Sequence, residues 1–128
     1  MQDLYHKKVM DYYTASTYRG LLDKPDLVAD ATSASCGDHV IFHLQCKADT
    51  ITAIKFQGEG SILGQAVAAM LCERFINRSF GDLFAFTPKD LDQLLGVELG
   101  PTRMRTVIFM LETLQAGVRS YAQSRISR

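Results

Sequence analysis

The chain has 128 residues, of which 47% are hydrophobic and 22% are charged. We expect one globular domain, because a chain of this length buries enough apolar surface for a core without disulfides and is too apolar to be disordered. The 14 basic and 14 acidic side chains cancel, so no overall positive field attracts nucleic acid or anionic lipid, and we expect neither as a partner.

The N-terminal residues and the spacing of the cysteines indicate in which cellular compartment the protein is expected. The first residues contain no apolar core of a signal peptide, and no segment approaches the ~18 consecutive apolar residues of a membrane span. Cys36, Cys46 and Cys72 are odd in number and widely spaced, which does not suggest a disulfide framework. We therefore expect a cytoplasmic protein with reduced thiols.

The first half of the chain is predicted to form one helix and three strands. Apolar and aromatic side chains at helical spacing predict a helix over residues 2–16, and a turn-rich connection follows over residues 16–25. Strand-like runs then occupy residues 27–35, 39–47 and 51–56. The short turn between the last two runs favours a hairpin.

The second of these strands has the clearest alternation. Its polar face carries His39, His43 and Gln45, and its apolar face carries Val40, Phe42, Leu44 and Cys46. Alternation with a period of two indicates one buried and one solvated face. We expect the histidines to be exposed and Cys46 to be a small buried side chain.

The second half of the chain is predicted to be helical. Residues 57–60 read as a glycine-containing loop, and Ser61 is a good N-cap for the helix that follows. Pro88 and Pro101 open two more helices, because proline is favoured in a first turn, and residues 119–128 are expected to form a solvated tail. Strands followed by helices predict one α+β domain, with a three-stranded antiparallel sheet and helices packed on one face.

The sequence Ser-Cys-Gly-Asp at residues 35–38 is the first candidate site. Its thiol and carboxylate, Cys36 and Asp38, are two residues apart and can face one cation, and a thiolate selects zinc or iron over magnesium. A solvated turn explains the same four residues without any function, so the tetrapeptide alone leaves both interpretations open.

A glycine-rich turn is the second candidate site. Gly58, Gly60 and Gly64 lie between the third strand and the next helix, as in turns where glycines let the backbone approach a pyrophosphate at a helix N-terminus. That motif requires a parallel βαβ unit, and residues 77–86 show no convincing strand. A nucleotide-binding module stays an alternative.

The ordered motifs resemble the U-type iron–sulfur cluster assembly scaffolds, the family of IscU, SufU and the NifU N-terminal domain. The resemblance covers about residues 5–118 and rests on four anchors in the family's order: Asp-Tyr-Tyr at 11–13, Ser-Cys-Gly-Asp at 35–38, the strand at 51–56 with Gly-Glu-Gly-Ser at 58–61, and Gly-Pro-Thr-Arg-Met-Arg-Thr at 100–106. It implies a scaffold for iron–sulfur cluster assembly. No nucleophile, base and orienting group form a recognisable set, so we expect no enzyme.

The resemblance also implies a set of metal ligands, and this chain differs from the family at some of those positions. Such scaffolds hold metal or a nascent cluster with three cysteines and an aspartate or histidine. Cys36 and Asp38 match two of these positions, whereas Ser61 and Thr106 replace the other two cysteines and Arg105 precedes the last. Hydroxyls are poor ligands for soft metals, and structural zinc takes four protein ligands. We therefore expect zinc, iron or a nascent cluster to bind weakly, through Cys36 and Asp38.

A second interpretation keeps the family fold without the metal. The family receives sulfur from a cysteine desulfurase, which the resemblance implies as a partner. A chain with one cysteine at the tip can bind that enzyme or accept persulfide sulfur on Cys36. A second copy of the chain or a three-cysteine relative can complete the ligand shell if metal does bind.

Overall fold

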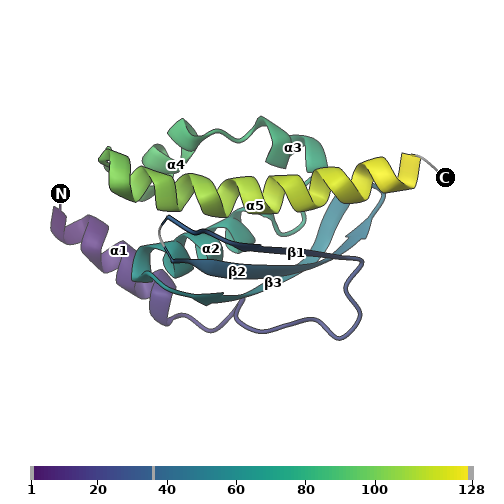
Figure 1. Cartoon of the computed structure of the whole chain (residues 1–128), viewed down its shortest axis with the longest axis horizontal. Coiled ribbons are helices and arrows are strands. Elements are labelled where there is room, and N and C mark those ends of the chain that lie inside the picture. The colour runs from purple at the N-terminus through teal and green to yellow at the C-terminus, as the bar shows by residue number, and fades with distance from the viewer. Residues whose placement is uncertain (1, 36, 127–128) are drawn as a thin grey trace.

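The fold is given by a computed structural model that describes residues 2–35 and 37–126. A three-stranded sheet lies beneath a set of helices (Figure 1). The elements are α1 (Gln2–Thr14), β1 (Leu27–Thr32), β2 (His39–Lys47), β3 (Thr50–Glu59), α2 (Ile62–Phe75), α3 (Phe80–Ala85), α4 (Pro88–Leu95) and α5 (Pro101–Ile126). The predicted α+β class and the three-stranded antiparallel sheet are confirmed.

The sheet is antiparallel throughout, in the order β1-β2-β3. The central pairs of the two ladders are Ala29 with Phe42 and Phe42 with Phe56. Ala48 and Asp49 join β2 to β3 and both have positive φ, 52° and 59°. A two-residue hairpin turn requires this left-handed backbone to match the twist of its strands, so the predicted hairpin is confirmed.

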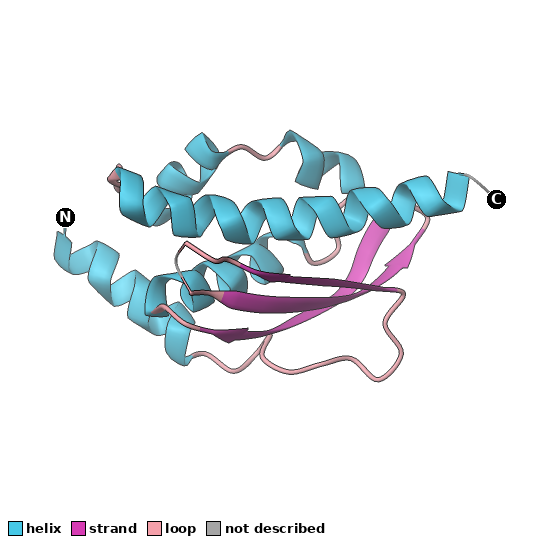
Figure 2. Cartoon of the chain, viewed as in Figure 1, coloured by secondary structure: helices cyan, strands magenta, loops and turns pink. Residues whose placement is uncertain are grey.

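The core lies between one face of the sheet and the helices, of which α2 and α5 pack directly on the strands (Figure 2). Val40, Phe42 and Leu44 of β2 are fully buried, as their alternation predicted. The long helix α5 crosses β1 at close range, because a Cβ on Gly117 would overlap the Cβ of Ala29. Helix α2 is buried along most of its length, so it forms the centre of the helical layer.

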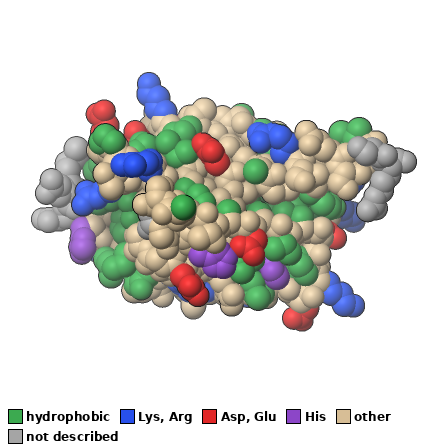
Figure 3. All heavy atoms as spheres, in the orientation of Figure 1, with side chains coloured by type: hydrophobic (Ala, Val, Ile, Leu, Met, Phe, Trp, Pro, Cys, Tyr) green, Lys and Arg blue, Asp and Glu red, His purple; other side chains and the backbone are tan. Residues whose placement is uncertain are grey.

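The open face of the sheet carries polar and titratable side chains. Figure 3 shows histidine, acidic and apolar side chains scattered over this face. His39 Nε2 lies 2.7 Å from Asp30 Oδ1, and His43 Nδ1 lies 3.2 Å from the Leu22 amide nitrogen. Both histidines are partly exposed, which agrees with the polar face predicted for β2.

The two outer edges of the sheet differ. The edge of β3 is hydrogen-bonded by two other segments. Phe56 bonds to Tyr18 and Gly20 at 2.8 and 2.9 Å, and Ile51 bonds to Asn77 and Arg78 at 2.7 and 2.9 Å. In the part of the chain that the structure describes, β1 pairs with β2 alone. One edge of the sheet is therefore closed and the other is open.

Three local expectations were wrong. The predicted tail is helical as far as Ile126, because Val118 is buried, Tyr121 packs against Phe80, and Arg125 pairs with Asp49 at 3.1 Å. Strand β3 extends to Glu59, into the predicted loop. Cys46 is only half-buried, because the ladder shifts register between Gln45 and Cys46.

Two further findings concern the helices. Helix α3 was not predicted, because six residues are too few for a clear helical period. None of the helices in the described residues is long and apolar enough to cross a membrane.

Candidate functional site

Asp38 is the best-defined member of the predicted site. It directly precedes β2 and is fully buried. Its Oδ1 accepts a hydrogen bond from the Ser61 amide at 2.7 Å, and its Oδ2 accepts one from Ser61 Oγ at 3.3 Å. A buried carboxylate needs such partners to offset the loss of water. Asp38 therefore joins the β1–β2 tip to the start of α2.

Ser61 is the N-cap of α2, as the sequence predicted. Its backbone is extended, with φ −67° and ψ 148°, and its Oγ accepts a hydrogen bond from the Gly64 amide at 3.0 Å. The same hydroxyl donates to Asp38. A negative charge at a helix N-terminus is favourable because the free amides there carry partial positive charge. Asp38 and Ser61 thus cap α2 together.

Glycines let the chain close around this carboxylate. Gly60 has φ +111°, and a Cβ there would overlap Asp38 Oδ1. A Cβ on Gly64 would lie 2.9 Å from Met110 Cε and 3.2 Å from Asp38 Oδ2. These two glycines therefore allow close packing around Asp38. In the nucleotide-binding alternative, glycines would instead let the backbone approach a bound pyrophosphate.

Residues 105 and 106 lie near the start of α5 and differ in exposure. Thr106 is buried, with 6% of its surface exposed. It precedes Met110 by one helical turn, so both residues share the α5 face that contacts the start of α2. Arg105 is exposed, and within the described residues its side chain forms no ion pair. The structure brings Asp38, Ser61 and the Thr106 face of α5 to one end of the molecule, and the Arg105 side chain beside Thr106 is exposed there.

The donor set does not fit a closed metal site. Cys36, the predicted thiolate ligand and sulfur acceptor, lies outside the described residues. Within residues 2–35 and 37–126, no three His, Cys, Asp or Glu side chains gather as a metal site would require. Both oxygens of Asp38 are engaged by Ser61, and the hydroxyls of Ser61 and Thr106 are poor ligands for zinc or iron.

The other two cysteines are poor nucleophiles. Burial, reinforced by the negative charge of Asp26, raises the pKa of Cys46 to about 11 from its ordinary value of 9.0. Full burial raises the pKa of Cys72 well above its ordinary range. Because the thiolate is the reactive form, neither residue is suited to attack a sulfur donor near neutral pH.

The nucleotide-binding alternative loses its structural basis. Gly58 lies inside β3, opposite Val40, and β3 runs antiparallel to β2. No two strands of the described sheet run parallel, whereas the motif needs a parallel strand–helix–strand unit. The helix N-terminus is also already occupied by the Asp38 carboxylate.

Sequence reasoning missed the direct pairing of Asp38 with Ser61. The tetrapeptide left a cation site and a solvated turn both open, and the burial of its aspartate has no local signature. A partial signal existed in the two glycines that flank the N-cap serine, Gly60 and Gly64, because both positions need space for a neighbouring group.

Comparison with known proteins identifies the family of the chain. The NifU-like N terminal domain family matches residues 4–127. The chain is 24% identical over 118 residues to the iron–sulfur cluster assembly scaffold protein IscU of Thermotoga maritima, covering 92% of this chain and 80% of that protein. It is 24% identical over 135 residues to the zinc-dependent sulfurtransferase SufU of Bacillus subtilis, covering 92% and 91%.

A solved structure supports the fold. The putative iron–sulfur cluster assembly scaffold protein for the SUF system from Fervidobacterium islandicum superimposes with a TM-score of 0.77 at 21% identity, covering 91% of this chain and 98% of that one. Together, the family match across nearly the whole chain and this structural similarity confirm the resemblance seen in the ordered motifs. The chain belongs to the NifU-like N-terminal domain family, whose relatives include scaffold proteins for iron–sulfur cluster assembly.

Proposed function

We propose that this chain works in iron–sulfur cluster assembly by accepting sulfur on Cys36 from a cysteine desulfurase. The observation that carries the proposal is the pairing of Asp38 with Ser61. A hydroxyl replaces a thiol at position 61 and uses the neighbouring carboxylate as its hydrogen-bond partner. Because Thr106 replaces the remaining cysteine, the tip retains one thiol from the family's ligand set.

The sulfur-transfer step needs no oxidant or metal. The Cys36 thiolate attacks the outer sulfur of a persulfide on the desulfurase. A sulfur–sulfur bond forms on Cys36 while the donor's sulfur–sulfur bond breaks, and the desulfurase cysteine leaves as a thiolate. Cys36 then carries the persulfide, and the donor is ready for another cycle.

Two observations support this assignment. The raised pKa values of Cys46 and Cys72 leave Cys36 without a competing thiol near neutral pH. SufU of Bacillus subtilis is named as a zinc-dependent sulfurtransferase, so sulfur transfer is an activity of at least one relative. The expectation of no enzymatic role is therefore too narrow for this family.

Weak metal or cluster binding through Cys36 and Asp38 is the second candidate function. It is favoured by the unequal bonds of the carboxylate, since the Oδ2 contact to Ser61 Oγ, at 3.3 Å, is longer than the Oδ1 contact at 2.7 Å. A metal would compete for that oxygen, and a second copy or a three-cysteine relative would have to supply the missing ligands.

Sulfur acceptance is tested with a cysteine desulfurase and L-cysteine. After alkylation of the thiols, mass spectrometry measures the share of protein that carries one extra sulfur atom. We expect the label in the native chain and in Cys46→Ala, and its loss in Cys36→Ser. Equal labelling of Cys36→Ser, or an unlabelled native chain, would overturn the proposal.

The metal alternative is tested by calorimetric titration of reduced, metal-free protein with zinc or ferrous iron. We expect weak or undetectable binding by the native chain and tight binding by the double variant Ser61→Cys/Thr106→Cys. Stoichiometric tight binding by the native chain, abolished in Cys36→Ala, would instead establish the metal site.

A further inference from the structure

A hollow of about 460 Å³ lies at the opposite end of α2 from Ser61, between the end of α2 and helices α3 and α4. Since α2 has 14 residues, the two ends of this helix are separated by roughly 20 Å at ~1.5 Å per residue. The hollow is independent of the tip. Six of its lining residues form three pairs of like side chains: Arg74 and Arg78, Asp82 and Asp90, Phe75 and Phe86.

The two arginine side chains are exposed, and the charge of Arg74 acts on Asp90 from beyond ion-pair distance. The Arg74 guanidinium lies 5.8 Å from the centre of the Phe86 ring. The backbone of Arg78 is fixed at the edge of β3, because its carbonyl accepts a hydrogen bond from the Ile51 amide at 2.9 Å. Within the described residues, neither guanidinium forms an ion pair within 4.0 Å. Two strong hydrogen-bond donor groups are therefore available in one hollow.

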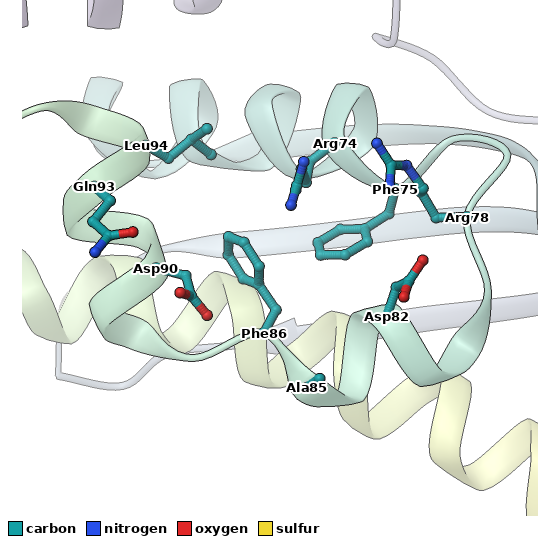
Figure 4. A pocket seen from close by; sticks show the side chains of 9 residues that line it. All are labelled: Arg74, Phe75, Arg78, Asp82, Ala85, Phe86, Asp90, Gln93 and Leu94. Carbon is teal, nitrogen blue, oxygen red and sulfur yellow. The ribbon is translucent and has the colours of Figure 1, made fainter.

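The opposite wall carries the negative charges. Figure 4 shows Arg74 and Arg78 on one side and Asp82 and Asp90 on the other, with the rings of Phe75 and Phe86 near the middle of the hollow. Asp90 Oδ2 accepts hydrogen bonds from the Thr87 amide at 2.8 Å and from Thr87 Oγ1 at 3.0 Å. These bonds hold the pKa of Asp90 below its ordinary value, which keeps the carboxylate charged.

The opposite charges form no ion pair within 4.0 Å in the described residues, although the charge of Arg74 helps to lower the pKa of Asp90. Asp90 is held by its helix cap and Asp82 lies in the first turn of α3, whereas both arginines belong to α2 and the connection after it. The rings of Phe75 and Phe86 lie edge to face, with centres 5.2 Å apart, and line the same hollow. A molecule that carries both charges can satisfy both walls at once.

We propose that this hollow binds a small ammonium–carboxylate zwitterion, with its carboxylate on Arg74 and Arg78 and its ammonium on the aspartate side. The class contains free α-amino acids and short peptides. They differ in the separation of their charges, which grows by up to ~3.5 Å for each residue of extended chain. A planar guanidinium suits the carboxylate end because it can donate two parallel hydrogen bonds.

The test is a titration of the full chain with glycine, glycylglycine and triglycine, followed by amide and arginine side-chain NMR shifts. A mixture of acetate and ethylammonium at the same ionic strength is the control for unlinked charges. We expect saturable shifts around Arg74, Arg78 and Asp82 with a linked zwitterion only. The probe that binds most tightly shows whether the natural ligand is a free amino acid, which glycine represents, or a short peptide, which triglycine represents.

Three variants complete the experiment. We expect Arg78→Gln and Asp82→Asn each to weaken binding about tenfold, the effect of losing roughly one charge-assisted hydrogen bond. Arg119→Gln is the matched control, because Arg119, like Arg78, is an exposed arginine but does not line the hollow. Unchanged NMR shifts of residues far from the hollow show that each variant is folded. No shift with any zwitterion, equal shifts with the unlinked ions, or equal weakening by Arg119→Gln would overturn the proposal.

Discussion

Ser61 combines two roles that are usually separate. Its hydroxyl caps α2 by accepting from the Gly64 amide, and it donates to the buried carboxylate of Asp38. A cysteine at this position would be a better metal ligand but a weaker hydrogen-bond donor and acceptor. The replacement therefore exchanges metal affinity for a direct link between two segments of the chain.

We expect Ser61→Ala to lower the free energy of unfolding by about 2 kcal/mol, because it removes a helix cap and leaves a buried acceptor without one of its donors. Ser79→Ala is the matched control. Ser79 caps α3 through the Asp82 amide at 3.1 Å without reaching a buried carboxylate, so its loss should cost about 1 kcal/mol. Urea unfolding at pH 7 measures both. Equal losses would contradict the role assigned to Asp38.

The thiol of Cys46 provides a pH-dependent prediction. At pH 8 its alkylation by iodoacetamide in the folded protein should be about 100-fold slower than in the unfolded chain, because a pKa of about 11 instead of 9.0 reduces the thiolate fraction. The rate should rise with pH until about 11. Peptide mass spectrometry measures it, and rapid labelling of folded protein at pH 8 would refute the raised pKa.

The same shift has a consequence for stability. The folded state favours the protonated thiol of Cys46, so this contribution is fully present below pH 9 and is lost as the pH rises from 9 to about 11. The urea midpoint should fall over that interval, with a smaller slope in Cys46→Ala.

At the scale of elements, the close packing of α5 against β1 depends on a contact between two small residues. Gly117 faces Ala29 so closely that a methyl group at position 117 has no room. Helix α5 lies against β1 at this point, and the same helix presents Thr106 and Met110 toward the start of α2. The position of the site therefore depends on a residue that lies three helical turns away from it.

We expect Gly117→Ala to destabilise the protein by about 1–3 kcal/mol, because overpacking forces α5 away from β1. The same substitution at Gly81 of α3 should have the opposite sign and stabilise by about 0.5 kcal/mol, since the nearest atom to its Cβ is Ser79 Oγ at 3.7 Å and alanine restricts the unfolded chain. Thermal unfolding of both variants checks this contrast. A stabilising Gly117→Ala would show that α5 can move without cost.

Strands and helix starts could be predicted from the sequence where a local pattern of residues marks them. The alternation from Val40 to Leu44 determined which face of β2 is buried, and Ser61 and Pro88 marked helix starts that the structure confirms. The full length of α5 was not predictable, because its last turns are held by Phe80 and Asp49, which are distant in sequence.

The site was predictable only in part. Position in the chain marked Ser61 as a cap, but the burial of Asp38 depends on Gly60, Gly64 and Met110, which come from two other elements. No local pattern contains that information. Whether Cys36 and Asp38 act as ligands stays a prediction.

At the scale of the whole molecule, hydrogen bonds join the tip to the helical layer. Where a protein binds a structural metal, the site contributes to folding as well as to function. Here the hydrogen bonds of Asp38 connect the same segments directly. The fold should therefore not depend on metal.

We expect a chelator such as EDTA to leave the Tm of the native chain unchanged. In Ser61→Cys/Thr106→Cys, added zinc should raise the Tm by several degrees, because a ligand that binds only the folded state stabilises it by mass action. Differential scanning calorimetry of metal-free and zinc-loaded samples compares the two proteins. A large fall in the native Tm on chelation would show that a metal, not Asp38, joins the segments.

The unequal edges of the sheet limit how copies of this fold can associate through their strands. Residues 18–20 and 77–79 occupy the outer side of β3, so within the described chain another strand can be added only beside β1. Two copies joined there would each use their single open edge, and the shared sheet would have none left. Such growth would favour a pair over the open-ended strand stacks from which fibres form.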